Sequence, residues 1–138
     1  MRPASIIRFE QIFLAVLAVD LVAAILAFGT NVAALKANPA TANMGSGALI
    51  VMLVLYFAAA VALWFFAAWR RSVVAKWILA IWFIVSTCGL ALSLFEGVVF
   101  GLEAVLGWLG YALYAWAVSY LFKPDADAWF VKGPAPLP

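Results

Sequence analysis

The sequence predicts an all-α fold, an antiparallel bundle of four transmembrane helices with both ends of the chain in the cytoplasm. Three observations support this fold class: 70% of the 138 residues are hydrophobic, only 10% are charged, and the apolar residues form four long runs. Soluble domains carry about 25% charged residues, and a water-soluble fold of this length could not bury so much apolar surface. We therefore expect one membrane domain, residues 1–138, in which the lipid bilayer is the solvent.

Each of the four apolar runs is long enough to cross a membrane, which takes about 20 mostly apolar residues. The expected spans are residues 9–35, 47–69, 77–98 and 102–122. The first run is too long for the apolar region of a cleaved signal peptide. We interpret it as a membrane span that is kept in the mature protein.

The links between these runs are short and carry turn signals. Residues 36–46 are polar and contain Asn38-Pro39 and Gly45, residues 70–76 form a basic turn, and residues 95–104 contain two glycines. Short links make consecutive helices antiparallel neighbours.

The last segment, residues 123–138, is too polar to be a fifth span. Pro124 cannot continue the fourth helix, because it lacks a backbone N–H. In this cytoplasmic tail, Asp125 or Asp127 is expected to cap a short helical turn. Trp129 and Phe130 would then lie in the membrane interface.

The distribution of lysine and arginine predicts the orientation. If all four spans form, one side of the membrane holds seven basic residues and the other holds only Lys36. Basic residues are concentrated on the cytoplasmic side of membrane proteins, so both termini should lie there. We expect the cytoplasmic anchors to be Arg8, Arg70, Arg71, Lys76 and Lys123.

One acidic residue, Asp20, interrupts the apolar stretch AVLAVDLVAA at residues 15–24. It lies twelve residues beyond Arg8, which is about 18 Å along a helix, while half of the hydrocarbon core is about 15 Å thick. Asp20 is therefore expected near the bilayer centre, where an aspartate costs about 2.5–3.5 kcal/mol. We expect it to face protein, on a helix face shared with Ala24, Ala27 and Asn31.

The other spans carry polar side chains at a similar depth. These observations predict an intramembrane polar layer, formed by Asp20, Tyr56, Ser86 and one of the two tyrosines Tyr111 and Tyr114. Hydroxyl groups can satisfy a carboxyl group as donors and as acceptors. Two interpretations stay open. The layer either fixes helix packing, or it serves as a proton or cation relay or as a contact for a small ligand.

Two glutamates, Glu96 and Glu103, flank the link between the third and fourth spans. They are expected to be solvated on the non-cytoplasmic side. In an oligomer, a ring of such glutamates could instead attract cations at the mouth of a pore.

The sequence lacks the residues that several kinds of catalytic and metal-binding site require. It contains no histidine, a single cysteine (Cys88), and no phosphate-binding glycine motif. We therefore expect no catalytic residue, no metal and no cofactor, and we interpret Cys88 as a small packing residue. The net charge of +2 and the absence of a basic run argue against binding to nucleic acid.

Three stretches resemble a known group of proteins: RFEQIFL at 8–14, RRSVVAKW at 70–77 and LFKPDADAWF at 121–130. They are similar to segments of small bacterial four-span membrane proteins of uncharacterised function. In that group a basic turn precedes the third span and an aromatic segment follows the fourth. The resemblance implies a bacterial inner-membrane location, and it implies no activity and no functional residue.

The sequence thus favours a small integral membrane protein without enzymatic activity. It would act as an accessory subunit or as a module that contacts helices and lipid. Its partners would be the bilayer and either further copies of itself or a larger membrane complex. The alternative is a small proton or cation channel or transporter, as an oligomer or alone, that uses Asp20.

Overall fold

The computed structural model describes residues 2–96 and 101–131, apart from the side chains of residues 93–96 and 103. All regular secondary structure in this part of the chain is helical. The helices are α1 (Ala4–Leu26), α2 (Phe28–Ala37), α3 (Ser46–Ala68), α4 (Val73–Glu96), α5 (Leu102–Tyr120) and α6 (Pro124–Val131).

The helices are long and apolar enough to indicate a multi-pass membrane protein. Ala4–Leu26, Ser46–Ala68 and Val73–Leu92 could each cross a bilayer by length and composition. A fourth crossing is present if α5 and α6 are counted together as one segment, which is bent by 65° between Tyr120 and Pro124. Many apolar side chains on these helices are exposed, as expected where lipid takes the place of water.

The first apolar run differs from the expected single span over residues 9–35. The helix begins earlier, at Ala4, and is interrupted at Ala27, after which α2 forms a separate element. The Thr30 hydroxyl donates a 2.8 Å hydrogen bond to the Ala27 carbonyl at this break. Because the helix breaks here, the expected face shared by Asp20, Ala24, Ala27 and Asn31 does not continue, and Asn31 is exposed on α2.

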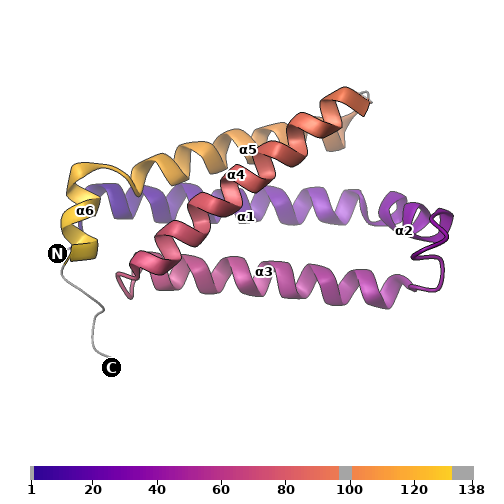
Figure 1. Cartoon of the computed structure of the whole chain (residues 1–138), viewed down its shortest axis with the longest axis horizontal. Coiled ribbons are helices and arrows are strands. Elements are labelled where there is room, and N and C mark those ends of the chain that lie inside the picture. Colours follow the sequence, from indigo (N-terminus) through magenta and orange to yellow (C-terminus); the bar gives the residue numbers. More distant parts are fainter. Residues whose placement is uncertain (1, 97–100, 132–138) are drawn as a thin grey trace.

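Figure 1 shows how the helices are arranged. α1 lies between α3 and α5, and it packs more extensively against α5 than against any other helix described. α4 crosses the molecule obliquely, from the end of α3 towards the start of α5. α6 turns across the end of the molecule at which α1 begins.

The buried core is concentrated at that end of the molecule. Its members come from the first half of α1, the last part of α3, the first part of α4, the end of α5, and α6. Phe9, Ile6, Leu79 and Leu121 are its largest fully buried side chains. Beyond the core, α1 and α3 line an open apolar groove of about 740 Å³ on one side. The helices are therefore tightly packed at one end and open at the other.

The two described turns have clear local causes. In the polar link, the Asn38 side chain accepts a 3.0 Å hydrogen bond from the Ala40 N–H, and the Thr41 hydroxyl donates to the Leu35 carbonyl at 2.8 Å. In the basic turn, the Ser72 hydroxyl accepts a 3.2 Å hydrogen bond from the Ala75 N–H at the start of α4. Both are side-chain to backbone bonds typical of helix ends.

The tail after the fourth apolar run corrects one expectation. Trp129 and Phe130 do not lie free in the membrane interface: they are only 7% and 4% exposed and belong to the core. The expected short helical turn is α6, with Asp125 and Asp127 in its first turn. The Asp125 carboxylate accepts a 3.1 Å hydrogen bond from the Ser5 N–H, which ties α6 to the beginning of α1.

Candidate functional site

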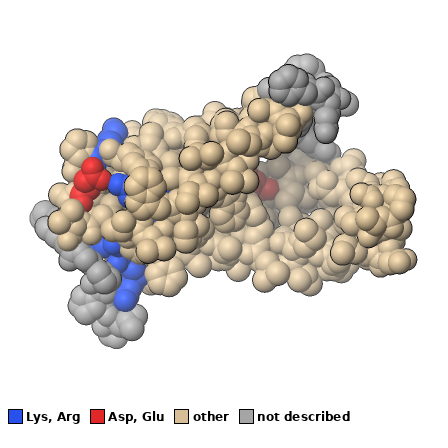
Figure 2. All heavy atoms as spheres, in the orientation of Figure 1, with Lys and Arg blue, Asp and Glu red and all other residues tan. Residues whose placement is uncertain are grey.

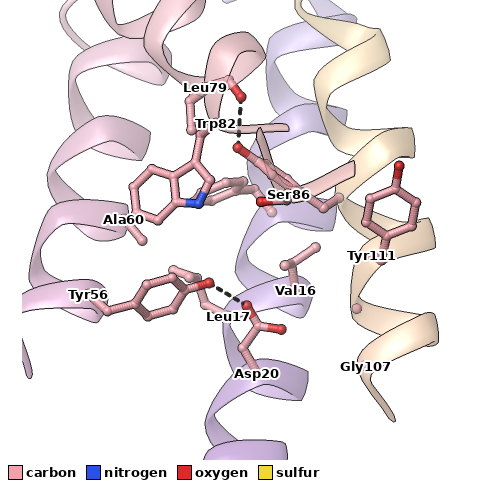
Figure 3. A pocket seen from close by; sticks show the side chains of 13 residues that line it. Val16, Leu17, Asp20, Tyr56, Ala60, Leu79, Trp82, Ser86, Gly107 and Tyr111 are labelled. Carbon is pink, nitrogen blue, oxygen red and sulfur yellow. Dashed lines mark hydrogen bonds between the residues drawn. The ribbon is translucent and has the colours of Figure 1, made fainter. Parts of the chain in front are cut away.

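A carboxyl group held by a tyrosine is the central feature of the candidate site. The Tyr56 hydroxyl, which comes from α3, donates a 2.9 Å hydrogen bond to Asp20 Oδ2 on α1 (Figure 3). The Tyr56 ring packs edge-on against Trp82 of α4, with 5.5 Å between ring centroids. α3 therefore binds the acid directly, and α4 packs against the tyrosine that holds it.

The other carboxylate oxygen lies against the backbone of α5. A Cβ atom placed on Gly110 would lie 2.8 Å from Asp20 Oδ1, closer than such contacts occur. Gly110 is buried, and Val19 of α1 is also near it. Glycine at this position lets α5 approach the carboxyl group while Tyr56 holds its other oxygen.

Asp20 and Tyr56 line a cavity of about 180 Å³ between α1, α3, α4 and α5. Figure 2 shows a hollow on this face of the molecule, with an acidic side chain deep inside it. The cavity is lined by Phe13, Val16, Leu17, Asp20, Tyr56, Ala60, Leu79, Trp82, Ser86, Gly107, Gly110, Tyr111 and Tyr114. An apolar cavity of about 150 Å³ accepts a benzene molecule, so this one has room for a small ring.

The structure brings all five residues of the expected polar layer to this cavity, but they do not form one network. Ser86 lines it from α4. The Tyr111 hydroxyl is 2.7 Å from Thr87 Oγ1, and the Tyr114 hydroxyl donates a 2.8 Å hydrogen bond to the Leu79 carbonyl. Both tyrosines thus join α5 to α4, and Tyr56 is the one described tyrosine whose hydroxyl bonds to Asp20.

No family model, curated protein or solved structure matches this chain.

Asp20 lies nearer to the end of α1 than to its beginning. α1 ends at Leu26, six residues beyond Asp20, so the carboxyl group lies only about 9 Å along the axis from that end. The cavity also borders the core residues Phe13, Leu17 and Leu79, so it lies where the packed half of the molecule meets the open half.

Sequence reasoning missed two contributors to the cavity. Gly110 could have been identified from the sequence, because a glycine inside a helix costs about 1 kcal/mol relative to alanine. Such a glycine often indicates that another group packs closely against the backbone. Trp82 gave no comparable signal, since one more aromatic residue in an apolar run is unremarkable. Its ring packs against Tyr56 only because α3 and α4 cross at that depth.

The expected pore-mouth acids cannot be placed as a pair. Glu96 is the last residue of α4 and Glu103 lies in the first turn of α5, but both side chains lie outside the described part of the structure. Cys88, expected as a packing residue, is instead exposed on α4.

The expected cytoplasmic anchors gather at the packed end, where basic side chains cluster in Figure 2. Arg8 and Lys123 are exposed, and Arg70 and Arg71 are half-buried. Lys76 differs from the expectation of an interfacial anchor, because it is only 6% exposed. Its ammonium group forms a 2.7 Å ion pair with Asp127 and lies 4.5 Å from the centre of the Phe122 ring.

The site can offer hydrogen bonds and aromatic surfaces to a small molecule. A carboxyl group accepts hydrogen bonds in either protonation state and also donates one when it is protonated. Aromatic faces attract ammonium groups and pack against rings. Among the described residues, no group of three His, Cys, Asp or Glu side chains could hold a metal ion.

Proposed function

We propose that this chain is a small, non-enzymatic membrane protein that binds a lipid-soluble small molecule in the cavity at Asp20. Four antiparallel spans would cross a bacterial inner membrane, with both termini in the cytoplasm. The concentration of basic residues at one end supports this orientation. The chain would act as an interaction module, because its exposed apolar faces could contact lipid or partner helices while the ligand is bound.

The observation that carries this proposal is the single carboxyl group in a mainly aromatic and aliphatic cavity of about 180 Å³, which Ser86 also lines. Tyr56 uses one oxygen of Asp20 and Gly110 lies against the other. A ligand of one ring with a hydroxyl or amino group matches both the volume and the polarity. An aspartate kept only for helix packing would not need an open cavity beside it.

Three fluorinated probes of similar size test this proposal: 4-fluorophenol, 4-fluorobenzylamine and fluorobenzene. Their binding to the detergent-solubilised chain is followed by ¹⁹F relaxation. We expect 4-fluorophenol or 4-fluorobenzylamine to bind more tightly than fluorobenzene. The Asp20→Asn variant should reduce that preference without removing the binding of fluorobenzene.

A matched pair of bulky substitutions distinguishes probe binding in the cavity from general partitioning of the probes into the micelle. Ser86→Phe fills the cavity from α4, while Cys88→Phe adds the same side chain at an exposed position two residues away. The first variant should lose probe binding and the second should keep it. Equal binding of all three probes by the wild type and by both variants would overturn the proposal.

A second candidate function is a proton or cation pathway that uses Asp20. It is favoured by the location of the carboxyl group in a hollow that opens on one face of the molecule. Purified chain in liposomes with an imposed proton or potassium gradient tests it. A flux that Asp20→Asn changes and Cys88→Ser does not would support the pathway, and an absence of flux from the wild type would exclude it.

A further inference from the structure

The turn between α3 and α4 carries two half-buried arginines, each with one side-chain nitrogen that is buried without an acceptor among the described residues. Within the described part of the chain, Arg70 Nη1 and Arg71 Nε have no hydrogen-bond partner, and the same is true of Trp129 Nε1 on α6. The Arg71 guanidinium lies 4.2 Å from the centre of the Trp129 ring. Buried donors without acceptors are costly, so three of them on neighbouring elements indicate that an acceptor group binds here.

The described acids around this turn are already engaged elsewhere. Glu10 forms a 2.6 Å ion pair with Arg2, and Asp127 forms a 2.7 Å pair with Lys76. The Asp125 carboxylate accepts the Ser5 N–H. No carboxylate among the described residues is therefore paired with the two arginines, which leaves them able to bind an anionic group from another molecule.

The backbone of the turn fixes where the Arg71 side chain leaves the end of α3. Arg71 has a φ of 55°, in the left-handed region where glycine or asparagine is usual. The turn is closed by a 3.0 Å hydrogen bond from the Ser72 N–H to the Phe66 carbonyl. A left-handed residue just after a helix is a common way for the helix to end, and glycine suits that position better than arginine.

We propose that Arg70, Arg71 and Trp129 form a binding site for an anionic phosphate group at the packed end of the molecule. The guanidinium groups would donate to phosphate oxygens, as arginine does in paired geometry, and the indole N–H would add a third donor. The phosphate would come from an anionic phospholipid headgroup or from a free phosphate. This site is separate from the Asp20 cavity and does not depend on the function proposed for it.

The test titrates the full chain in a phosphate-free detergent with three probes. Dihexanoyl phosphatidylglycerol carries the phosphate, dihexanoylglycerol has the same tails without it, and inorganic phosphate is the free anion. Binding is followed at the indole N–H signal of Trp129 by ¹⁵N–¹H NMR, assigned with Trp129→Phe. Because each lost charge-assisted bond is worth roughly a factor of ten in affinity, we expect the phospholipid to bind at least about ten-fold more tightly than dihexanoylglycerol.

Competition identifies the source of the phosphate. If inorganic phosphate displaces the phospholipid at the Trp129 signal, the site takes a free phosphate. If it does not, the site takes a lipid headgroup. Both results support a phosphate site, whereas equal affinity for phosphatidylglycerol and dihexanoylglycerol would overturn it.

The left-handed backbone at Arg71 allows a substitution that tests the site without disturbing the fold. Arg71→Gly removes the guanidinium and suits the backbone better than arginine, so the fold should be kept while phospholipid affinity falls about ten-fold or more. Arg8→Gln removes one exposed charge at the same end and should change the affinity by less than about two-fold. Arg70→Gln, which leaves the left-handed position untouched, should also weaken binding. Equal losses in the Arg8 and Arg71 variants would indicate general charge attraction and would contradict the site.

Discussion

At the scale of single residues, Asp20 is held between a tyrosine on one helix and a glycine on another. Tyr56 donates to Oδ2, and the Gly110 backbone leaves room for Oδ1. The carboxyl group therefore cannot rotate away from α5 without losing its hydrogen bond. This coupling makes the position of α5 on α1 sensitive to a single methyl group.

We expect Gly110→Ala to destabilise the chain by about 1 kcal/mol, because the new Cβ displaces the carboxyl group and breaks the bond to Tyr56. Tyr56→Phe should then cost little more in the Gly110→Ala background, although it is destabilising on its own. The free energy of unfolding in sodium dodecyl sulfate titrations measures both effects. Gly107→Ala is the control, since its Cβ would meet nothing within 4 Å; additive losses for the Gly110 and Tyr56 changes would contradict the coupling.

The sequence predicted which residue types share this cavity but not how they are connected. Asp20, Tyr56, Ser86, Tyr111 and Tyr114 were expected at one depth because each interrupts an apolar run. The bonds of Tyr111 to Thr87 and of Tyr114 to Leu79 depend on the oblique crossing of α4. A helical period places a residue on a face, but it does not give the angle between two helices.

At the scale of helices, α6 is attached to the bundle by charged residues as well as by its aromatic side chains. Lys76 on α4 is almost fully buried and pairs with Asp127, while Asp125 binds the beginning of α1. A buried charge that loses its partner costs more than one that is replaced by an apolar side chain. The two members of the Lys76–Asp127 pair should therefore respond differently to substitution.

We expect Asp127→Ala to destabilise the docking of α6 by about 1–3 kcal/mol, because it leaves the Lys76 ammonium without its carboxylate. Lys76→Met, which keeps the volume and removes the charge, should cost less. In the double variant, the loss should resemble that of Lys76→Met alone. Hydrogen exchange of the α6 amides measures the docking, and a larger loss from Lys76→Met than from Asp127→Ala would contradict this account.

The contact between Asp125 and the start of α1 should depend on pH. The Ser5 hydroxyl and backbone N–H beside Asp125 hold the pKa of its carboxyl group below its usual range. Its contribution to stability is therefore present above the unfolded pKa of about 3.9 and is lost as the pH falls through the lower folded pKa. We expect the Ser5 amide to lose protection from hydrogen exchange below about pH 4. Asp125→Ala should remove that protection already at neutral pH, and protection that persists in the variant would rule out the contact as its cause.

Helix boundaries could be predicted only where a strong signal marks them. Pro124 and the polar link after Lys36 agree closely with the observed helix ends. The break at Ala27 was not predicted, because residues 9–35 are apolar almost throughout. The Thr30 hydroxyl donates to the Ala27 carbonyl at the break, and a hydropathy pattern does not record such a contact.

At the scale of the whole molecule, tight packing and charge are found at the same end. The buried core, the ion pairs and most basic residues lie where α1 begins and α6 crosses. The Asp20 cavity lies at the edge of this core, and the apolar groove between α1 and α3 lies beyond it, where the helices are less tightly packed. A bilayer can supply the missing contacts there, since lipid tails pack against apolar side chains as well as another helix does.

This asymmetry leads to a prediction about orientation. If the packed end is cytoplasmic, as the basic residues indicate, green fluorescent protein fused after residue 138 should fluoresce in bacterial cells. Alkaline phosphatase inserted between residues 38 and 45 should be active, because that link would lie outside the cytoplasm, and phosphatase fused after residue 138 should be inactive.

A control for this orientation changes the balance of positive charge between the two sides of the membrane. Changing Arg70 and Arg71 together to glutamine removes two of the basic residues beside the α3–α4 turn and should raise the phosphatase activity of the fusion after residue 138. The same double change is expected to weaken phosphate binding, but the fusion assay reports only the side of the membrane and so tests orientation separately. Phosphatase activity of the unaltered chain at both insertion points would contradict an even number of crossings, and α5 with α6 would then not form a fourth span.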